Sequence, residues 1–245
     1  SIFANQCFNK GNTKVTLGTG ASILTNIGES FEHNNNIITT LSYVYGNKPS
    51  YSYECLINYA GATISWLKNN LKIISNEKET NQVFAKTENT EGVVFVPAFV
   101  GLSSPHWKPD SKALIYGLTP SINKNHIIRA ALESIAFQIK DYLDDLEVKN
   151  KIKYNDIFID GGIVSNTSFI QFLTNTLNKK IYVTNYQDMS SYGALMMGLL
   201  GMKIKKSIKE MKTLRQKYLV YAPSKNNSAN KSYENWKLVL KKFYF

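Results

Sequence analysis

The chain has 245 residues, 43% of them hydrophobic, and its 29 basic and 18 acidic side chains give a formal net charge of +11. This length suits one large domain or two small ones, and the apolar fraction suffices for a substantial core. No apolar run reaches the ~18 residues that a membrane-spanning helix needs, and the first residues lack a signal-peptide pattern. Arginine, which suits bidentate recognition of nucleic acids, occurs only at Arg129 and Arg215. We therefore interpret the charge as solvated lysine faces rather than a nucleic-acid surface.

Residue types that bind metals or form disulfides are scarce. Cys7 and Cys55 lie in unlike contexts, and the three histidines, His33, His106 and His126, show no metal-ligand spacing. We therefore expect idle thiols in a reducing compartment, the cytoplasm, with an organelle as the alternative.

The first elements are strands around a glycine turn. Apolar residues over 15–17 and 23–27 flank Gly18-Thr19-Gly20, a pattern typical of two strands joined by a tight turn. Residues 37–45 predict a further strand, which ends at a turn cluster over 46–49.

A helix is expected from Glu54 to Leu71, where apolar side chains recur at helical spacing with Gly61 among them. An interior glycine costs a helix about 1 kcal/mol relative to alanine. Either another part of the molecule approaches Gly61 closely, or the helix begins there.

The middle of the chain predicts two short strands, over 93–96 and 114–118, followed by the strongest helix. Asn125 is the expected N-cap, and one apolar stripe extends from Ile127 to Leu146. The helix carries three aspartates on or near its polar side, and we expect them to be solvated: Asp141, Asp144 and Asp145.

Residues 157–166 form the most informative segment. An apolar run, 157–159, precedes Asp160-Gly161-Gly162, and helical periodicity begins after Asn166. Adjacent glycines let backbone approach a ligand closely, and the helix start directs N–H groups and positive dipole at an anion. The segment predicts a nucleotide or phosphate site, with a plain strand-to-helix turn as the alternative.

The last part predicts a strand over 181–183, a helix over 192–200 and two lysine-rich helical stretches. Three small residues should allow close packing of the first of these helices: Ala194, Gly198 and Gly201. Residues 223–231 are expected to be a polar linker, and three apolar residues should attach the final helix: Trp236, Leu238 and Leu240. Strands and helices alternate without a repeat, so the fold class is α/β with a mixed sheet.

The sequence resembles the FGGY carbohydrate kinases. Ala113-Leu114-Ile115-Tyr116-Gly117-Leu118, separated by seven residues from His126-Ile127-Ile128-Arg129-Ala130-Ala131-Leu132-Glu133, fits the second signature of that family. Within the family, residues 95–102 and Pro105-His106-Trp107 are most similar to the glycerol kinases. The resemblance extends from about residue 3 to residue 202, with all motifs in family order.

The resemblance implies an actin-like ATPase fold, in which two ribonuclease-H-like domains enclose a cleft. Residues 1–220 would be the C-terminal nucleotide-binding domain, a mixed sheet flanked by helices, and residues 221–245 a linker and a helix packed on it. The implied reaction transfers the γ-phosphoryl group of ATP to a polyol or sugar hydroxyl, most simply that of glycerol, with Mg²⁺ as counterion.

The resemblance also implies the cofactor-binding residues. Thr19 matches a threonine that contacts phosphate, and Gly162 and Asn166 match residues around the adenine and α-phosphate. Asp160 is expected either to orient the glycine turn or to act near the metal. The full set of implied nucleotide-binding residues is Gly18, Thr19, Gly20, Gly61, Ser65, Asp160, Gly161, Gly162 and Asn166.

Three departures from the family pattern leave the activity open. The family's catalytic aspartate lies in a Gly-Asp-Gln run just ahead of the segment that matches Ser1, and no carboxylate here replaces it by motif, so we assign no catalytic or metal-binding residue. Ser22 stands where glycerol kinases usually carry an aromatic residue that packs on the acceptor, and Ser65 where they commonly carry glutamine.

Three hypotheses follow. The chain is part of a glycerol-kinase-like enzyme, part of another FGGY kinase, or a non-catalytic descendant that binds partners in a complex. An N-terminal kinase domain is the expected partner in the first two cases. The oligomeric state is open between a homo-oligomer and a larger complex.

Overall fold

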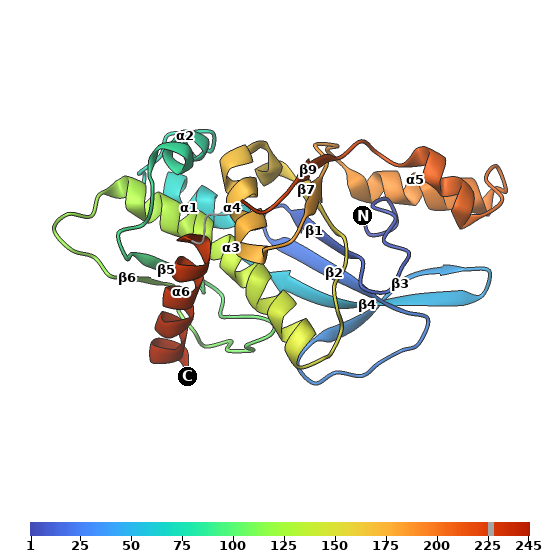
Figure 1. Cartoon of the computed structure of the whole chain (residues 1–245), viewed down its shortest axis with the longest axis horizontal. Helices are drawn as coiled ribbons and strands as arrows, with labels where there is room; N and C mark the ends of the chain where they lie inside the picture. Colours follow the sequence, from blue (N-terminus) through green and yellow to red (C-terminus); the bar gives the residue numbers. More distant parts are fainter. Residues whose placement is uncertain (225–227) are drawn as a thin grey trace.

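The computed structural model describes residues 1–224 and 228–245, and its centre is a seven-stranded mixed sheet in the order β3-β4-β2-β1-β7-β8-β9. Figure 1 shows helices packed against this sheet, as expected for the α/β class. The strands are β1 Thr13–Leu17, β2 Ala21–Gly28, β3 Ile38–Tyr45, β4 Lys48–Ile57, β7 Ile157–Gly161, β8 Ile181–Val183 and β9 Leu219–Tyr221.

Three central strands, β1, β7 and β8, are parallel, and the remaining pairs in this sheet are antiparallel. In the β1–β7 pair, Thr16 is opposite Asp160 and Leu17 is opposite Gly161. Because parallel strands end at the same edge of a sheet, the turns after Leu17 and Gly161 lie next to each other.

The helices occupy both ends of the molecule. The longest one, α3, crosses the sheet beside α4, whereas α5 lies at the end opposite α2 and α6 (Figure 1). The remaining elements are α1 Gly61–Asn69, α2 Glu79–Lys86, β5 Val94–Val96 paired with β6 Leu114–Tyr116, α3 Lys124–Val148, the 3₁₀ segments η1 Gly162–Ser165 and η2 Ile208–Leu214, α4 Thr167–Leu177, α5 Met189–Gly201 and α6 Ser228–Tyr244.

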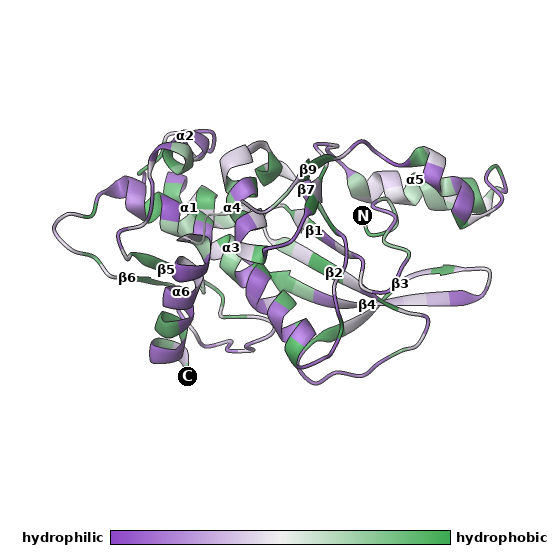
Figure 2. Cartoon of the chain, viewed as in Figure 1, coloured by the Kyte–Doolittle hydropathy of each residue, from purple (hydrophilic) through white to green (hydrophobic). Residues whose placement is uncertain are grey.

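The apolar stripe of α3 forms the centre of the core, as its periodicity predicts. Figure 2 shows apolar residues along the central strands and a mixed pattern on α3, whose outer face is polar. Six isoleucine and leucine residues of this stripe are fully buried: Ile128, Leu132, Ile135, Ile139, Leu143 and Leu146.

The expected N-cap of α3 was wrong by two residues. Asn123 caps the helix: its side chain accepts a hydrogen bond from the N–H of Asn125 at 2.9 Å. His126 Nδ1 in turn accepts from the N–H of Asn123 at 3.2 Å, which completes a capping box and gives this histidine a structural role.

The prediction of three solvated aspartates on α3 was also wrong for two of them, whereas the side chain of Asp144 is 36% exposed. Asp145 is buried and paired with Lys149. Asp141 accepts a hydrogen bond from the Tyr233 hydroxyl of α6 at 2.8 Å and contacts His106. Because α6 docks on the side of α3 that carries Asp141, this side is an interface rather than a solvent-exposed face.

Several expectations for the chain's second half need correction. Ala194, Gly198 and Gly201 of α5 are exposed. Gly193 instead packs closely on Ala4, because a Cβ added to Gly193 would lie 3.4 Å from the Ala4 nitrogen.

The final helix is attached by Trp236 and Leu240, whereas Leu238 is exposed. The expected linker over 223–231 partly forms α6, which includes Ser228, and residues 225–227 lie outside the described part of the chain.

The sheet face opposite α3 carries a buried polar network. Lys14, only 3% exposed, donates to the Ser22 carbonyl at 3.1 Å, the Ser22 hydroxyl at 2.9 Å and the Thr16 hydroxyl at 3.2 Å. Nearby, Asn5 donates to Asp160 Oδ2 at 2.8 Å. The N-terminal segment therefore covers this face through polar contacts as well as through Ile2 and Cys7, which pack against Phe158 of β7.

Lys14 predicts a pH dependence of stability. Burial lowers its pKa to about 8, opposed by the charges of Asp160 and Glu54, whereas an unfolded lysine titrates near 10.4. Between these values the unfolded chain binds more protons than the folded chain, so the contribution of Lys14 to stability increases with pH.

We expect the unfolding free energy of the wild type to rise by about 2 kcal/mol relative to Lys14→Met between about pH 7 and about pH 9.5. Urea unfolding at several pH values measures this difference. A constant difference across the range would contradict the shifted pKa.

Candidate nucleotide-binding site

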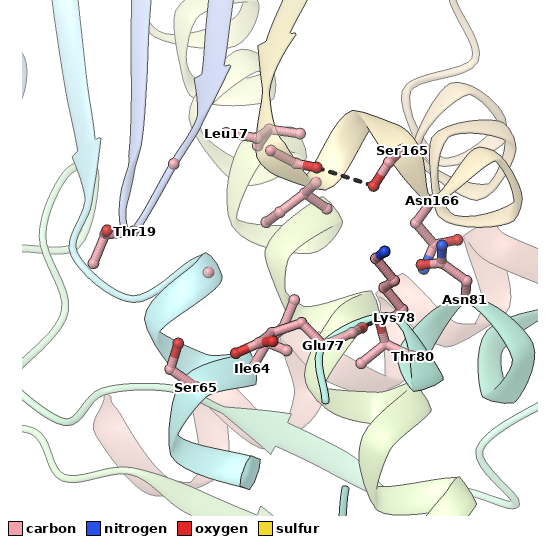
Figure 3. A pocket seen from close by; sticks show the side chains of 14 residues that line it. Leu17, Thr19, Ile64, Ser65, Glu77, Lys78, Thr80, Asn81, Ser165 and Asn166 are labelled. Atoms are coloured by element: carbon pink, nitrogen blue, oxygen red, sulfur yellow. Dashed lines mark hydrogen bonds between the residues drawn. The ribbon is translucent and has the colours of Figure 1, made fainter. Parts of the chain in front are cut away.

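A cavity of about 420 Å³ lies at the edge of the sheet where β1 and β7 end. We call it the edge cavity, and four segments line it (Figure 3). These are Leu17, Gly18 and Thr19 after β1; Gly61, Ile64 and Ser65 of α1; Glu77, Lys78, Thr80 and Asn81 at the start of α2; and Gly162, Ile163, Ser165 and Asn166 after β7.

The turn between β1 and β2 is joined directly to the start of α1. The N–H of Gly61 donates to the Gly18 carbonyl at 3.0 Å, and the N–H of Ala62 donates to the Thr19 carbonyl at 2.8 Å. A Cβ on Gly61 would lie 2.6 Å from the Gly18 oxygen. Both explanations of this glycine therefore hold: the helix begins at Gly61, and the hairpin approaches it closely.

The two glycines after Asp160 have different surroundings. Gly161 has φ +108°, and a Cβ there would lie 2.3 Å from the Leu17 oxygen, so strand pairing requires glycine. Gly162 has no such φ, and a Cβ there would meet nothing within 4 Å. Gly162 therefore leaves open space on the wall of the edge cavity.

Asn166 presents an unpaired donor to the edge cavity. Its Oδ1 caps α4 by accepting from the N–H of Phe169 at 3.0 Å, while its Nδ2 is buried without a hydrogen-bond partner. A buried donor without a partner costs about 1–3 kcal/mol, so a ligand acceptor at this position would be stabilising. Figure 3 shows the Asn166 side chain beside that of Asn81.

Six of the nine sequence-predicted residues line the edge cavity: Gly18, Thr19, Gly61, Ser65, Gly162 and Asn166. The other three lie behind its wall. Gly20 packs on β4, since a Cβ would lie 2.5 Å from the Ile57 oxygen, and Gly161 packs on Leu17. Asp160 is 2% exposed and accepts from Asn5 on the opposite face of the sheet.

Sequence reasoning missed the segment that begins α2. Phe84 fixes this segment by packing against Phe169 and Phe172 of α4, with ring centroids 6.1 and 5.4 Å apart. These contacts place Asn81 next to the capping residue Asn166. The helix spans only eight residues, and the aromatic partners lie far away in the sequence, so local periodicity carries little signal.

Glu77 is the carboxylate that lines the edge cavity, and it is ion-paired with Lys68 at 3.0 Å. Hydrogen bonds from its own backbone N–H and from Lys68 hold the pKa of Glu77 below its ordinary value, so the side chain is ionised at neutral pH. Across residues 1–224 and 228–245, no cluster of three or more His, Cys, Asp or Glu side chains could hold a metal ion.

The sequence model of the FGGY family of carbohydrate kinases, C-terminal domain, matches residues 13–202. The chain belongs to this family. The resemblance seen in the signature residues is thereby confirmed. Among the described residues, no helix is long and apolar enough to cross a membrane.

Relatives and solved structures agree with the FGGY assignment. The chain is 36% identical over 240 residues to a glycerol kinase of Fusobacterium nucleatum, covering 96% of this chain and 48% of that protein. It is 36% identical over 247 residues to glycerol kinase 1 of Thermotoga maritima, covering 99% and 50%. The chain thus spans about half the length of the relatives it matches.

The fold matches solved FGGY kinases over nearly the whole chain. The crystal structure of Plasmodium falciparum glycerol kinase with ADP superposes with a TM-score of 0.90 at 35% identity, covering 100% of this chain and 49% of that one. A ligand-bound xylulose kinase from Lactobacillus acidophilus has a TM-score of 0.85 at 17% identity, covering 98% and 49%, and shares the fold. The predicted actin-like fold is confirmed.

The same substitution should have a large effect on stability at Gly161 and a small one at Gly162. Gly161→Ala should lower the unfolding free energy by at least about 2 kcal/mol, because the new Cβ meets Leu17 backbone at positive φ. Gly162→Ala should change it by less than about 1 kcal/mol. Urea unfolding of both variants measures the contrast, and equal losses would refute the different roles.

Proposed function

We propose that the edge cavity binds ATP and that this chain is the nucleotide-binding half of a polyol kinase, with glycerol as the acceptor. The observation that carries the proposal is the meeting of the Gly18-Thr19 turn, the Gly162 turn and the unpaired Nδ2 donor of Asn166 around one cavity. The glycerol kinase structure with ADP supports an adenine nucleotide, and the glycerol kinase relatives support glycerol as the acceptor.

The residues of the cavity fit a nucleotide. The backbone N–H and hydroxyl of Thr19 would donate to phosphate oxygens from a turn that is exposed, whereas the N–H of Gly18 is bonded to the Gly20 carbonyl at 2.9 Å. The start of α4 adds the positive end of a helix dipole beside Asn166. Asn166 Nδ2 would donate to a ligand acceptor and so lose its burial penalty.

Mg²⁺ fits the edge cavity less well than the nucleotide does. Mg²⁺ is usually bound by one or two carboxylates, substrate phosphates and water. In this chain, Glu77 is already paired with Lys68, and Asp160 faces Asn5 behind the wall. The residues described here therefore do not form a protein-held magnesium site.

The residue at position 22 favours a second candidate acceptor. Ser22 stands where glycerol kinases carry an aromatic residue, and its hydroxyl accepts from Lys14 at 2.9 Å. A polar hydroxyl there supplies no apolar surface for a small polyol, which favours another polyol or a sugar as the acceptor of a second candidate FGGY kinase.

Nucleotide binding by this chain tests the proposed site. Gly162→Leu should weaken ADP binding at least tenfold, because the new side chain occupies the open space on the cavity wall. Asn166→Asp should also weaken binding, because it keeps the Oδ1 cap and removes the Nδ2 donor.

Isothermal titration calorimetry measures both dissociation constants. The control is Gly198→Leu, at an exposed helix glycine whose Cβ would meet nothing within 4 Å. Equal affinities of wild type and Gly162→Leu would defeat the placement of the nucleotide.

Turnover by the product of the complete reading frame tests the kinase assignment. Thr19→Ala should lower kcat at least tenfold, since a hydroxyl donor to phosphate is lost. Thr119→Ala is the control, because its hydroxyl bonds to Ser121 in an exposed loop.

ADP release with glycerol, xylulose and gluconate in a coupled assay identifies the acceptor. Release with glycerol alone favours the first candidate, and release with a sugar favours the second. No ADP release with any acceptor would oppose both.

A further inference from the structure

Glu77 places a carboxylate on the wall of the edge cavity, apart from the turns that are proposed to face the phosphates. The residue lies on the wall formed by the segment before α2, and it is anchored to α1 through Lys68 at 3.0 Å. Gly61 and Lys68 are seven residues apart on one helix, so at 1.5 Å per residue they are separated by about 10 Å along the axis. This separation suits the distance from the phosphates of a nucleotide to its base.

The wall between these two points is apolar. Ile64 is 6% exposed and lies on the same face of α1 as Gly61 and Lys68, while Ile163 lines the cavity from the turn after β7. Aliphatic side chains of this kind suit the flat face of a base. Figure 3 shows Glu77 extending over Ile64 toward Ser65, whereas Lys78 extends toward Asn166.

The carboxylate of Glu77 determines which base edge is compatible with the site. An ionised carboxylate only accepts hydrogen bonds, so it favours a donor opposite it and repels an acceptor. Adenine carries an amino group at position 6, and hypoxanthine carries a carbonyl oxygen there. The two bases otherwise have nearly the same shape, but N1 accepts in adenine and carries a hydrogen in hypoxanthine, so the comparison tests the edge formed by position 6 and N1.

We propose that Glu77 selects the base of the bound nucleotide by accepting a hydrogen bond from the 6-amino group of adenine. The proposal rests on the proposed function, because it concerns the same cavity. The proposal gives a specificity-determining role to a residue of the segment before α2, which the sequence alone did not predict to be part of the site.

The chain offers a matched pair of variants for the test. Glu77→Gln keeps the shape of the side chain and adds an amide donor that suits a carbonyl oxygen as well as an amino group. Glu79→Gln is the control, because Glu79 accepts from the N–H of Ser75 at 3.2 Å and from Asn76 at 3.3 Å within its own loop, and it does not line the cavity. Glu77 is 53% exposed, so the substitution should not disturb folding.

Dissociation constants for ATP, ITP and GTP are measured by titration calorimetry with the wild type and both variants. We expect the wild type to bind ATP at least tenfold more tightly than ITP, Glu77→Gln to reduce that ratio to less than threefold, and Glu79→Gln to retain it. An ATP-to-ITP ratio that Glu77→Gln leaves unchanged would overturn the assignment of Glu77.

Two further outcomes separate this inference from the proposed function. Tight ATP binding with equal ITP binding, or tighter GTP than ATP binding, would refute base selection by Glu77 and leave the nucleotide site in place. No binding of any of the three nucleotides by the wild type would refute the proposed function and this inference with it.

Discussion

The parallel pairing of β1 with β7 is the constraint on which the rest of the site depends. These strands lie far apart in the sequence, and α3 is the last element before β7 in the long connection between them. Their register places Leu17 opposite Gly161, so the turns that follow them meet at one edge. A side chain at Gly161 would enter the Leu17 backbone, so the pairing itself depends on a missing Cβ.

The glycines near this edge divide between packing and ligand space. Gly20, Gly61 and Gly161 permit backbone segments to approach each other, with a Cβ at each position 2.3 to 2.6 Å from a carbonyl oxygen. Gly162 borders open space. The first three glycines therefore let the walls of the edge cavity approach each other, whereas Gly162 leaves room between them.

The face of the sheet opposite α3 contains two charged groups that are buried among uncharged partners. Lys14 and Asp160 lie on neighbouring strands beneath the N-terminal segment, and each is bonded to uncharged polar groups. The sequence left open whether Asp160 orients the glycine turn or acts near the metal. In the structure its carboxylate accepts a hydrogen bond from Asn5 on this face. A buried charge that is bonded only to neutral groups depends on the precise position of the covering segment, so the first residues of the chain belong to the folded domain.

Local patterns in the sequence determined the glycine turns, most of the strands and the core stripe of α3, because each pattern reflects contacts between near neighbours. Family resemblance then related Thr19 and Gly162 to one nucleotide. Only the tertiary structure decided that Glu77 and Asn81 join the cavity, that Asp141 and Asp145 are covered, and that Asn166 has an unpaired amide. The position of Asn81 depends on Phe84 docking against α4, and the covering of Asp141 depends on α6 docking against α3. Such contacts between distant segments leave no periodic signal in the chain.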